Sequence, residues 1–292
     1  MELFQYPYMQ RALIGALVIG LAAPALGIYL VQRRLALIGD GVGHVALTGV
    51  GAGLLLNRSP VLVAVIAATI GAIAIEIVRA RGRTSGDLAL ALLFYGGIAG
   101  GVLLVGLSDA TSANLNAYLF GSLTTISPAD LTTIAVLGAA ILVTMIALRP
   151  ALFAVSHDEE YARVSGLPVR TLNLLIAVAT AVTVTIAMRA VGVLLISALM
   201  VVPVATAQQV TRGFRSTMAA AMALGLFAAG SGVWVAATAD TAPGASVVLV
   251  AIASFLVVAV AGALWRVVRR RTTPTAAPTA APTPEPHEVV LG

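Results

Sequence analysis

Long apolar runs are the feature that most restricts how this chain can fold. A helix needs about 20 mostly apolar residues to cross a bilayer. Runs close to that length lie at residues 11–32, 35–56, 60–78, 86–106, 130–148, 171–188, 190–210, 217–238 and 244–265. Arg189 alone separates the sixth run from the seventh. The sequence therefore predicts an all-α, polytopic transmembrane helical bundle with eight or nine spans.

Composition agrees with a membrane protein and excludes several kinds of site. Hydrophobic residues make up 60% of the chain and charged residues only 10%, against about 25% charged in soluble domains. The lack of cysteine excludes disulfides and thiolate metal ligands. Every basic residue is an arginine, so a Walker A loop, which requires lysine, is excluded. The chain also lacks an HExxH motif and a nucleophile–base set, and we do not expect it to be an enzyme.

The arginines predict how the chain is oriented in the membrane. With nine spans, 14 of the 17 arginines fall on one side, and only Arg11, Arg58 and Arg189 fall on the other. Arginine-rich loops usually face the cytoplasm. We therefore expect a multi-pass protein of the cell membrane with its N-terminus outside and its C-terminus inside. The same loops account for the net charge of +5, so nucleic acid is not an expected partner.

The last residues of the chain differ from the rest in composition. Residues 272–292 are rich in proline, threonine and alanine. Frequent prolines prevent a helix from continuing, and the segment has few apolar groups to bury. We expect a disordered cytoplasmic tail at 272–292 and a transmembrane permease domain at 1–271.

Small residues mark where helices are expected to pack closely. Glycine pairs four residues apart occur at Gly39/Gly43, Gly49/Gly53, Gly96/Gly100 and Gly97/Gly101. Such pairs let helix backbones approach each other within a membrane. They indicate either general bundle packing or helices that border a transport pathway. Pro203 lies inside an apolar run and is expected to kink its helix.

Asp40 and His44 are the most informative polar residues within the apolar runs. Their spacing of four places both side chains on one face of a helix. One carboxylate and one imidazole suit Zn²⁺, Mn²⁺ or Fe²⁺ better than Mg²⁺ or Ca²⁺. The alternatives are an Asp–His hydrogen bond that fixes helix packing, or an aspartate near the membrane surface. Two ligands are half a coordination shell, so other helices, water or a second subunit would supply the rest.

The loop between the fifth and sixth runs has the features of a docking helix. Ser156 and Glu159 fit a capping box. The pattern predicts a helix of about two turns, with Tyr161 and Val164 on one face, before Gly166 and Pro168 end it. So short a helix is marginal in water, which indicates that a partner stabilises it.

Four stretches resemble permeases of the ABC-3 family, which import zinc, manganese and iron. They are RRLALIGDGVGHVAL at 33–47, LFGSLTTISPADL at 119–131, DEEYARVSGLPV at 158–169 and VGVLLISALMVVPVATA at 191–207. The third contains the E-x-A-x-x-x-G spacing by which importer permeases engage their ATPases. One departure is Gly43, where the family usually has serine.

The resemblance implies the ABC importer permease fold of the metal-uptake type and a set of partners. Asp40 and His44 would bind a passing Zn²⁺ or Mn²⁺ ion, with Fe²⁺ a further candidate and no permanently bound cofactor. The ATPase-coupling residues would be Asp158, Glu159, Glu160, Ala162 and Gly166. The partners would be cytoplasmic ABC ATPases, an extracytoplasmic metal-binding lipoprotein, a second permease subunit and membrane lipid. The alternative is a self-contained secondary transporter or channel that uses Asp40 and His44 as a proton or cation relay.

Overall fold

The computed structural model describes residues 6–80, 86–108, 112–122, 124, 126–193 and 195–272, and all regular elements in this part of the chain are helices. The helices are α1 (Pro7–Gln32), α2 (Ile38–Leu55), α3 (Pro60–Ala80), α4 (Gly86–Gly106), α5 (Ser112–Phe120), α6 (Pro128–Ala147), α7 (Arg149–His157), α8 (Glu159–Val164), α9 (Val169–Ala187), α10 (Ile196–Val210), α11 (Phe214–Ala239) and α12 (Pro243–Thr272). The all-α prediction is therefore confirmed. The tail predicted at 272–292 lies outside the described residues, apart from Thr272, which ends α12.

Among the described residues, seven helices are long and apolar enough to cross a membrane. They are α1, α2, α3, α6, α9, α11 and the part of α12 from Pro243 to Trp265. Two shorter apolar helices cover Leu90–Gly106 and Ile196–Val210. These match the fourth and seventh predicted runs in position, but the second of them is only 15 residues long. The structure thus supports a multi-pass membrane protein without confirming eight or nine spans.

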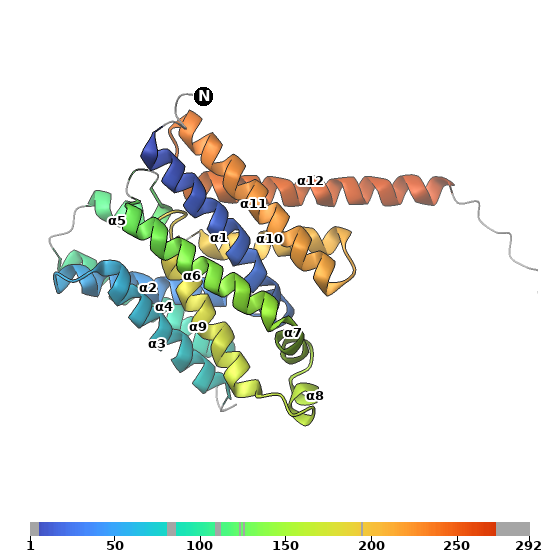
Figure 1. The fold of residues 1–292 in the computed structure, drawn as a ribbon, viewed down its shortest axis with the longest axis horizontal. Helices are drawn as coiled ribbons and strands as arrows, with labels where there is room; N and C mark the ends of the chain where they lie inside the picture. Colours follow the sequence, from blue (N-terminus) through green and yellow to red (C-terminus); the bar gives the residue numbers. More distant parts are fainter. Residues whose placement is uncertain are drawn as a thin grey trace, which may run out of the picture.

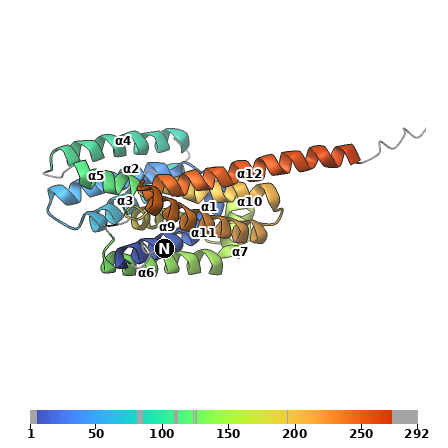
Figure 2. The same cartoon turned by 90° about the horizontal axis from the view of Figure 1, so that it is seen from above.

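The bundle is built around α1 (Figure 1). This helix is buried along most of its length and packs against α6, α9, α10 and α11. The view from above places α4 and α6 on opposite faces, with α1 between them (Figure 2). The α12 helix leaves the bundle, and many of its apolar side chains are exposed, as expected for a surface that meets lipid.

The described residues between α9 and α10 are mostly buried but not helical. The sequence predicts a span that begins at 190, whereas α10 begins only at Ile196. The intervening residues pack on the end of α5, where the Val193 amide donates to the Tyr118 carbonyl at 3.0 Å. Gly121 and Gly192 adopt φ values of +78° and +91° in this contact, a conformation that glycine adopts without steric cost. The prediction of a helix from 190 is wrong because tertiary contacts satisfy these backbone groups instead.

Two helices that the sequence analysis did not predict are α5 and α7. Both are nine residues long and lie in segments that were interpreted as loops. In α7, Pro150 lies near the start of the helix, and the side chains of Leu152 and Val155 are buried on one face. That pattern was visible in the sequence, since proline favours the first turn of a helix.

Glycines of α4 bring that helix into close contact with α2. A Cβ atom on Gly97 would lie 2.7 Å from the carbonyl carbon of His44, and one on Gly101 would lie 2.9 Å from Leu47. A Cβ on Gly100 would lie 3.1 Å from Thr48. Gly96, in contrast, is exposed, with nothing in the described chain within 4 Å of such an atom. Gly96 therefore makes no close helix contact among the described residues, and the α4 glycines that meet α2 are Gly97, Gly100 and Gly101.

Candidate metal site and coupling helix

Asp40 lies where two helices begin. It occupies the first turn of α2 and accepts a hydrogen bond from the hydroxyl of Ser197, in the first turn of α10. The positive ends of both helix dipoles stabilise negative charge at this point. Gly39 also lies beside Ser197, with a Cβ position 3.2 Å from the serine Cβ. The short side chains at this crossing let the carboxylate and the hydroxyl meet.

His44 lies one turn further along α2 and carries an unsatisfied nitrogen. Its side chain is buried, and its Nδ1 atom has no hydrogen-bond partner among the described residues. Its ring meets Phe94 of α4 edge to face, with the ring centres 4.4 Å apart. Buried polar atoms normally have a partner. A lone imidazole nitrogen beside a carboxylate is therefore a candidate metal ligand.

One of the two alternatives raised for Asp40 and His44 is a hydrogen bond between them. None of the hydrogen bonds in the described chain joins the two side chains, and Asp40 accepts one from Ser197 instead. The residue before His44, Gly43, lies near the end of α9 that is away from α8. A Cβ on Gly43 would lie 3.6 Å from Val184, in the last turn of α9, whereas the first turns of α9 lie beside α8.

The structure gives a steric reason for the glycine at position 43, where the resemblance predicted a serine. A Cβ on Gly43 would lie 3.1 Å from the Val193 side chain and 3.2 Å from the Val193 carbonyl oxygen. The glycine therefore faces the buried segment before α10. A serine hydroxyl could not be added here without displacing Val193 by a few tenths of an ångström.

Ser197 is the site residue that sequence reasoning missed. It lies 157 positions from Asp40, as a single small polar residue in the otherwise apolar first half of the run at 190–210. No group of three or more His, Cys, Asp or Glu side chains with metal-binding geometry occurs among the described residues. One chain thus offers a carboxylate, an imidazole nitrogen and, at most, a hydroxyl oxygen. Water or a second subunit would have to complete the shell of a bound ion.

The predicted docking helix is α8, but its cap differs from the one expected. Asp158, not Ser156, is the N-cap, and its carboxylate accepts a hydrogen bond from the Tyr161 amide at 2.9 Å. Ser156 lies buried inside α7. The Ser156–Glu159 capping box is therefore wrong, because α7 occupies the residues that would have preceded the cap.

The spacing of Ala162 and Gly166 has a structural reason. Ala162 is the buried residue that anchors α8. Gly166 ends the segment with φ +80°, which other residues adopt only with strain. The apolar side chains of Tyr161 and Val164 are 66% and 89% exposed. An exposed apolar pair on a helix of six residues is typical of a surface that a partner covers.

Glu159 links α8 to the interior of the bundle. Its carboxylate lies 3.7 Å from the Arg33 guanidinium and accepts a hydrogen bond of 3.3 Å from Asn173 of α9. Glu160, the next residue, is exposed. Burial lowers the pKa of Arg33, while the carboxylates of Glu76 and Glu159 act in the opposite direction. Arg33 follows α1 directly and begins the turn that leads into α2, so this contact connects the docking helix to the helix that carries Asp40.

Comparisons with known proteins bear on the family of this chain. The profile of the ABC 3 transport family matches residues 5–262. The high-affinity zinc uptake system membrane protein ZnuB of Haemophilus influenzae is 32% identical, over 82% of this chain and 91% of that protein. The manganese transport system membrane protein MntC of Halalkalibacterium halodurans is 30% identical, over 86% of each chain.

A solved structure shows the same fold. A chain of PsaBC from Streptococcus pneumoniae, determined in complex with Fab, superposes with a TM-score of 0.79 at 29% identity. The match covers 87% of this chain and 92% of that one. Since the family profile spans nearly the whole chain, the protein belongs to the ABC 3 transport family.

Proposed function

We propose that this chain is the membrane-spanning permease subunit of an ATP-binding cassette importer for divalent transition-metal ions. The observation that carries the proposal is the meeting of Asp40 and Ser197 one turn from the unpartnered Nδ1 of His44. Such a donor set favours Zn²⁺ or Mn²⁺, with Fe²⁺ a further candidate, over Mg²⁺ and Ca²⁺. The zinc and manganese systems named for its relatives support the same class of cargo.

An incomplete ligand set suits transport. A complete protein shell around zinc would release the ion slowly, whereas two or three ligands hold it only in passage. A binding protein would deliver the ion on the face away from α8, and closure of two ATPases would move α8. The exposed side chains of Tyr161, Val164 and Glu160 would meet the ATPase. We expect each chain to cross the membrane nine times, with α4 and α10 among the crossings, and α8 to lie in the cytoplasm. A second permease copy completes the proposed assembly.

Metal-dependent ATPase stimulation tests this function. The permease, reconstituted with its ATPase and binding protein, should hydrolyse ATP faster with Zn²⁺ or Mn²⁺ bound to the binding protein, but not with Mg²⁺ or Ca²⁺ added in their place. The permease reconstituted alone should not transport metal. Gradient-driven metal or proton flux through the chain alone would contradict the proposal and favour a secondary transporter or channel.

We infer separately that Glu159 and Glu160 divide the coupling task. Glu160→Arg should reduce co-purification with the ATPase, because this exposed carboxylate is placed to meet the partner. Glu159→Gln should leave co-purification intact but lower the metal transported per ATP by about 2–30-fold, because it weakens the contact with Arg33. The measurement is uptake and hydrolysis on the same proteoliposomes.

Arg212→Gln is a matched control for these variants. It removes an exposed charge just before α11. The start of α11 lies close to α7, since Phe214 contacts Phe153. The variant should leave metal uptake and ATP hydrolysis unchanged. If Glu159→Gln lost ATPase binding to the same extent as Glu160→Arg, Glu159 would be a docking residue and the proposed division would be wrong.

A further inference from the structure

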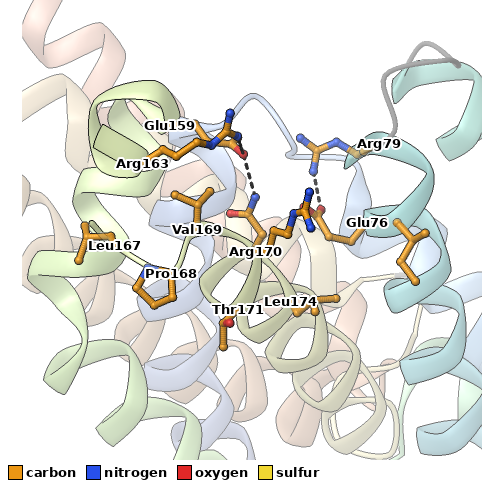
Figure 3. Close-up of a pocket in the computed structure, with 12 residues that line it drawn as sticks. Glu76, Arg79, Glu159, Arg163, Leu167, Pro168, Val169, Arg170, Thr171 and Leu174 are labelled. Carbon is orange, nitrogen blue, oxygen red and sulfur yellow. Dashed lines mark hydrogen bonds and ion pairs between the residues drawn. The ribbon is translucent and has the colours of Figure 1, made fainter. Parts of the chain in front are cut away.

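An open pocket of about 770 Å³ lies between the end of α3 and the start of α9, beside α8. Neither the proposed metal site nor the ATPase contact uses it. Figure 3 shows Arg79 and Arg163 on opposite sides of the opening, with Arg170 between them. Leu167, Pro168 and Leu174 form an apolar part of the wall. The pocket thus combines cationic groups with an apolar surface.

Positive charge exceeds negative charge around this pocket. The Glu76 carboxylate forms an ion pair with the Arg79 guanidinium at 2.7 Å. The Glu159 carboxylate lies 3.7 Å from the guanidinium groups of both Arg33 and Arg163. Arg170 has no acidic partner among the described residues. Three arginines and two glutamates therefore line the pocket, with Arg33 a further cation near Glu159, and the excess of positive charge favours an anionic ligand.

Two further groups at the pocket suit a phosphate that carries hydroxyl groups. The first turn of α9 has no side-chain cap, and open helix N-termini bind phosphate through their backbone N–H groups. Asn173 lines the pocket, is only 6% exposed, and has an Oδ1 atom without a hydrogen-bond partner in the described chain. Its Nδ2 atom donates to Glu159, which leaves the buried Oδ1 as the acceptor without a partner.

The apolar side of the pocket continues onto a face that meets lipid. Ile77 lines the pocket and is 43% exposed. Ile66 and Ile70, on the same helix, are also exposed. A spacing of four and then seven residues places all three on one face of α3. A lipid whose acyl chain lies along this face would have its head group at the arginines of the pocket.

We propose that the pocket between α3 and α9 binds an anionic phospholipid with a glycerol head group. The phosphate lies against Arg170 and the start of α9, the glycerol hydroxyl donates to Asn173, and an acyl chain follows Ile77 along α3. Basic pockets at the ends of membrane helices hold lipid head groups in this way. The lipid would tie α8 and α9 to α3 at the end of the bundle where the ATPase is expected. The proposal does not depend on which ion is transported.

Native mass spectrometry of the full-length chain in detergent tests this site. With phosphatidylglycerol and phosphatidylcholine supplied in equal amounts, phosphatidylglycerol should be retained preferentially. Arg170→Gln should weaken its binding about fivefold, the effect of one arginine near a lipid phosphate. Arg215→Gln is the matched control, because Arg215 is exposed in the first turn of α11 and does not line the pocket. It should bind phosphatidylglycerol like the wild type.

Further arms separate the possible ligands. Inorganic phosphate in excess should not displace phosphatidylglycerol, and Ile77→Asn should weaken lipid retention without loss of the folded protein on size exclusion. Displacement by phosphate alone would show a free-anion site and overturn the lipid assignment. Equal losses for Arg170→Gln and Arg215→Gln would show non-specific attraction and overturn the site. Loss of ATPase binding in Arg170→Gln with unchanged lipid retention would assign the pocket to the ATPase instead.

Discussion

Replacing Asp40 with Asn or His44 with Ala should lower metal uptake by the assembled transporter by more than about 100-fold. Even changes to groups behind the ligands cost roughly 10–100-fold in metal affinity, and among the described residues these two are the acidic and imidazole groups placed at the site. Asparagine keeps the size of Asp40 and its bond to Ser197 but removes the charge. Uptake of radioactive Zn²⁺ or Mn²⁺ into proteoliposomes, with ATPase co-purification measured in parallel, checks the prediction.

The chain offers a matched control for each change. Asp240 is exposed at the end of α11 with φ +50°, a conformation that asparagine tolerates, so Asp240→Asn should be silent. His157 is exposed at the end of α7, so His157→Ala should also be silent. Ser197→Ala should give an intermediate loss of about tenfold, since it removes the group that holds Asp40. Normal uptake by both Asp40→Asn and His44→Ala would refute the site assignment.

Gly97→Val should destabilise the whole bundle, whereas the same change at the adjacent Gly96 should not. A Cβ on Gly97 would lie 2.7 Å from backbone atoms of His44 and Val45, so α2 and α4 would have to separate. Overpacking of a core typically lowers the free energy of unfolding by about 1–3 kcal/mol. The cost of Gly97→Val should reach or exceed the upper end of this range, because backbone atoms cannot move aside by changing rotamer. The measurement is the thermal unfolding midpoint in detergent, combined with metal uptake.

Gly96 provides the comparison because it is exposed on α4 with open space around its Cα. Gly96→Val should leave the midpoint unchanged or raise it slightly, since valine has a better helix propensity than glycine. Thr48 strengthens the contact that Gly97 permits, because its hydroxyl donates to the Gly97 carbonyl at 2.7 Å. Equal midpoints for the two glycine variants would mean that α2 and α4 separate readily and that this contact is not needed to position His44.

Parts of the site were predictable because they depend on local spacing. Asp40 and His44 share a face since an α-helix repeats every 3.6 residues. A short helix was expected in the loop where α8 lies, since the sequence there ends in Gly166 and Pro168. Its cap was assigned to the wrong residue, because sequence patterns do not say where a preceding helix stops. The family resemblance rested on four separated stretches, and the profile match over residues 5–262 agrees with it.

Other features depend on contacts between distant parts of the chain. Ser197 could not be paired with Asp40 from sequence, because the pairing requires the buried turn between α9 and α10. Glu76 lies three residues before Arg79 in the sequence, but its neighbours across the pocket come from α8 and α9. The difference between Gly96 and Gly97 follows from the rotation of α4 against α2, which a uniformly apolar helix does not encode in its pattern.

The sequence by itself determined that this chain lies in a membrane as a set of helices, because long apolar runs have few other stable conformations there. It also excluded a Walker A loop from these 292 residues, since no lysine is present. Only the tertiary structure decided what each polar group faces. Asp40 meets Ser197, Glu159 turns inward while Glu160 remains exposed, and three arginines line one pocket. The physical reason is that helix formation in a bilayer depends on local hydrophobicity, whereas the partner of a buried polar group depends on which helices cross beside it.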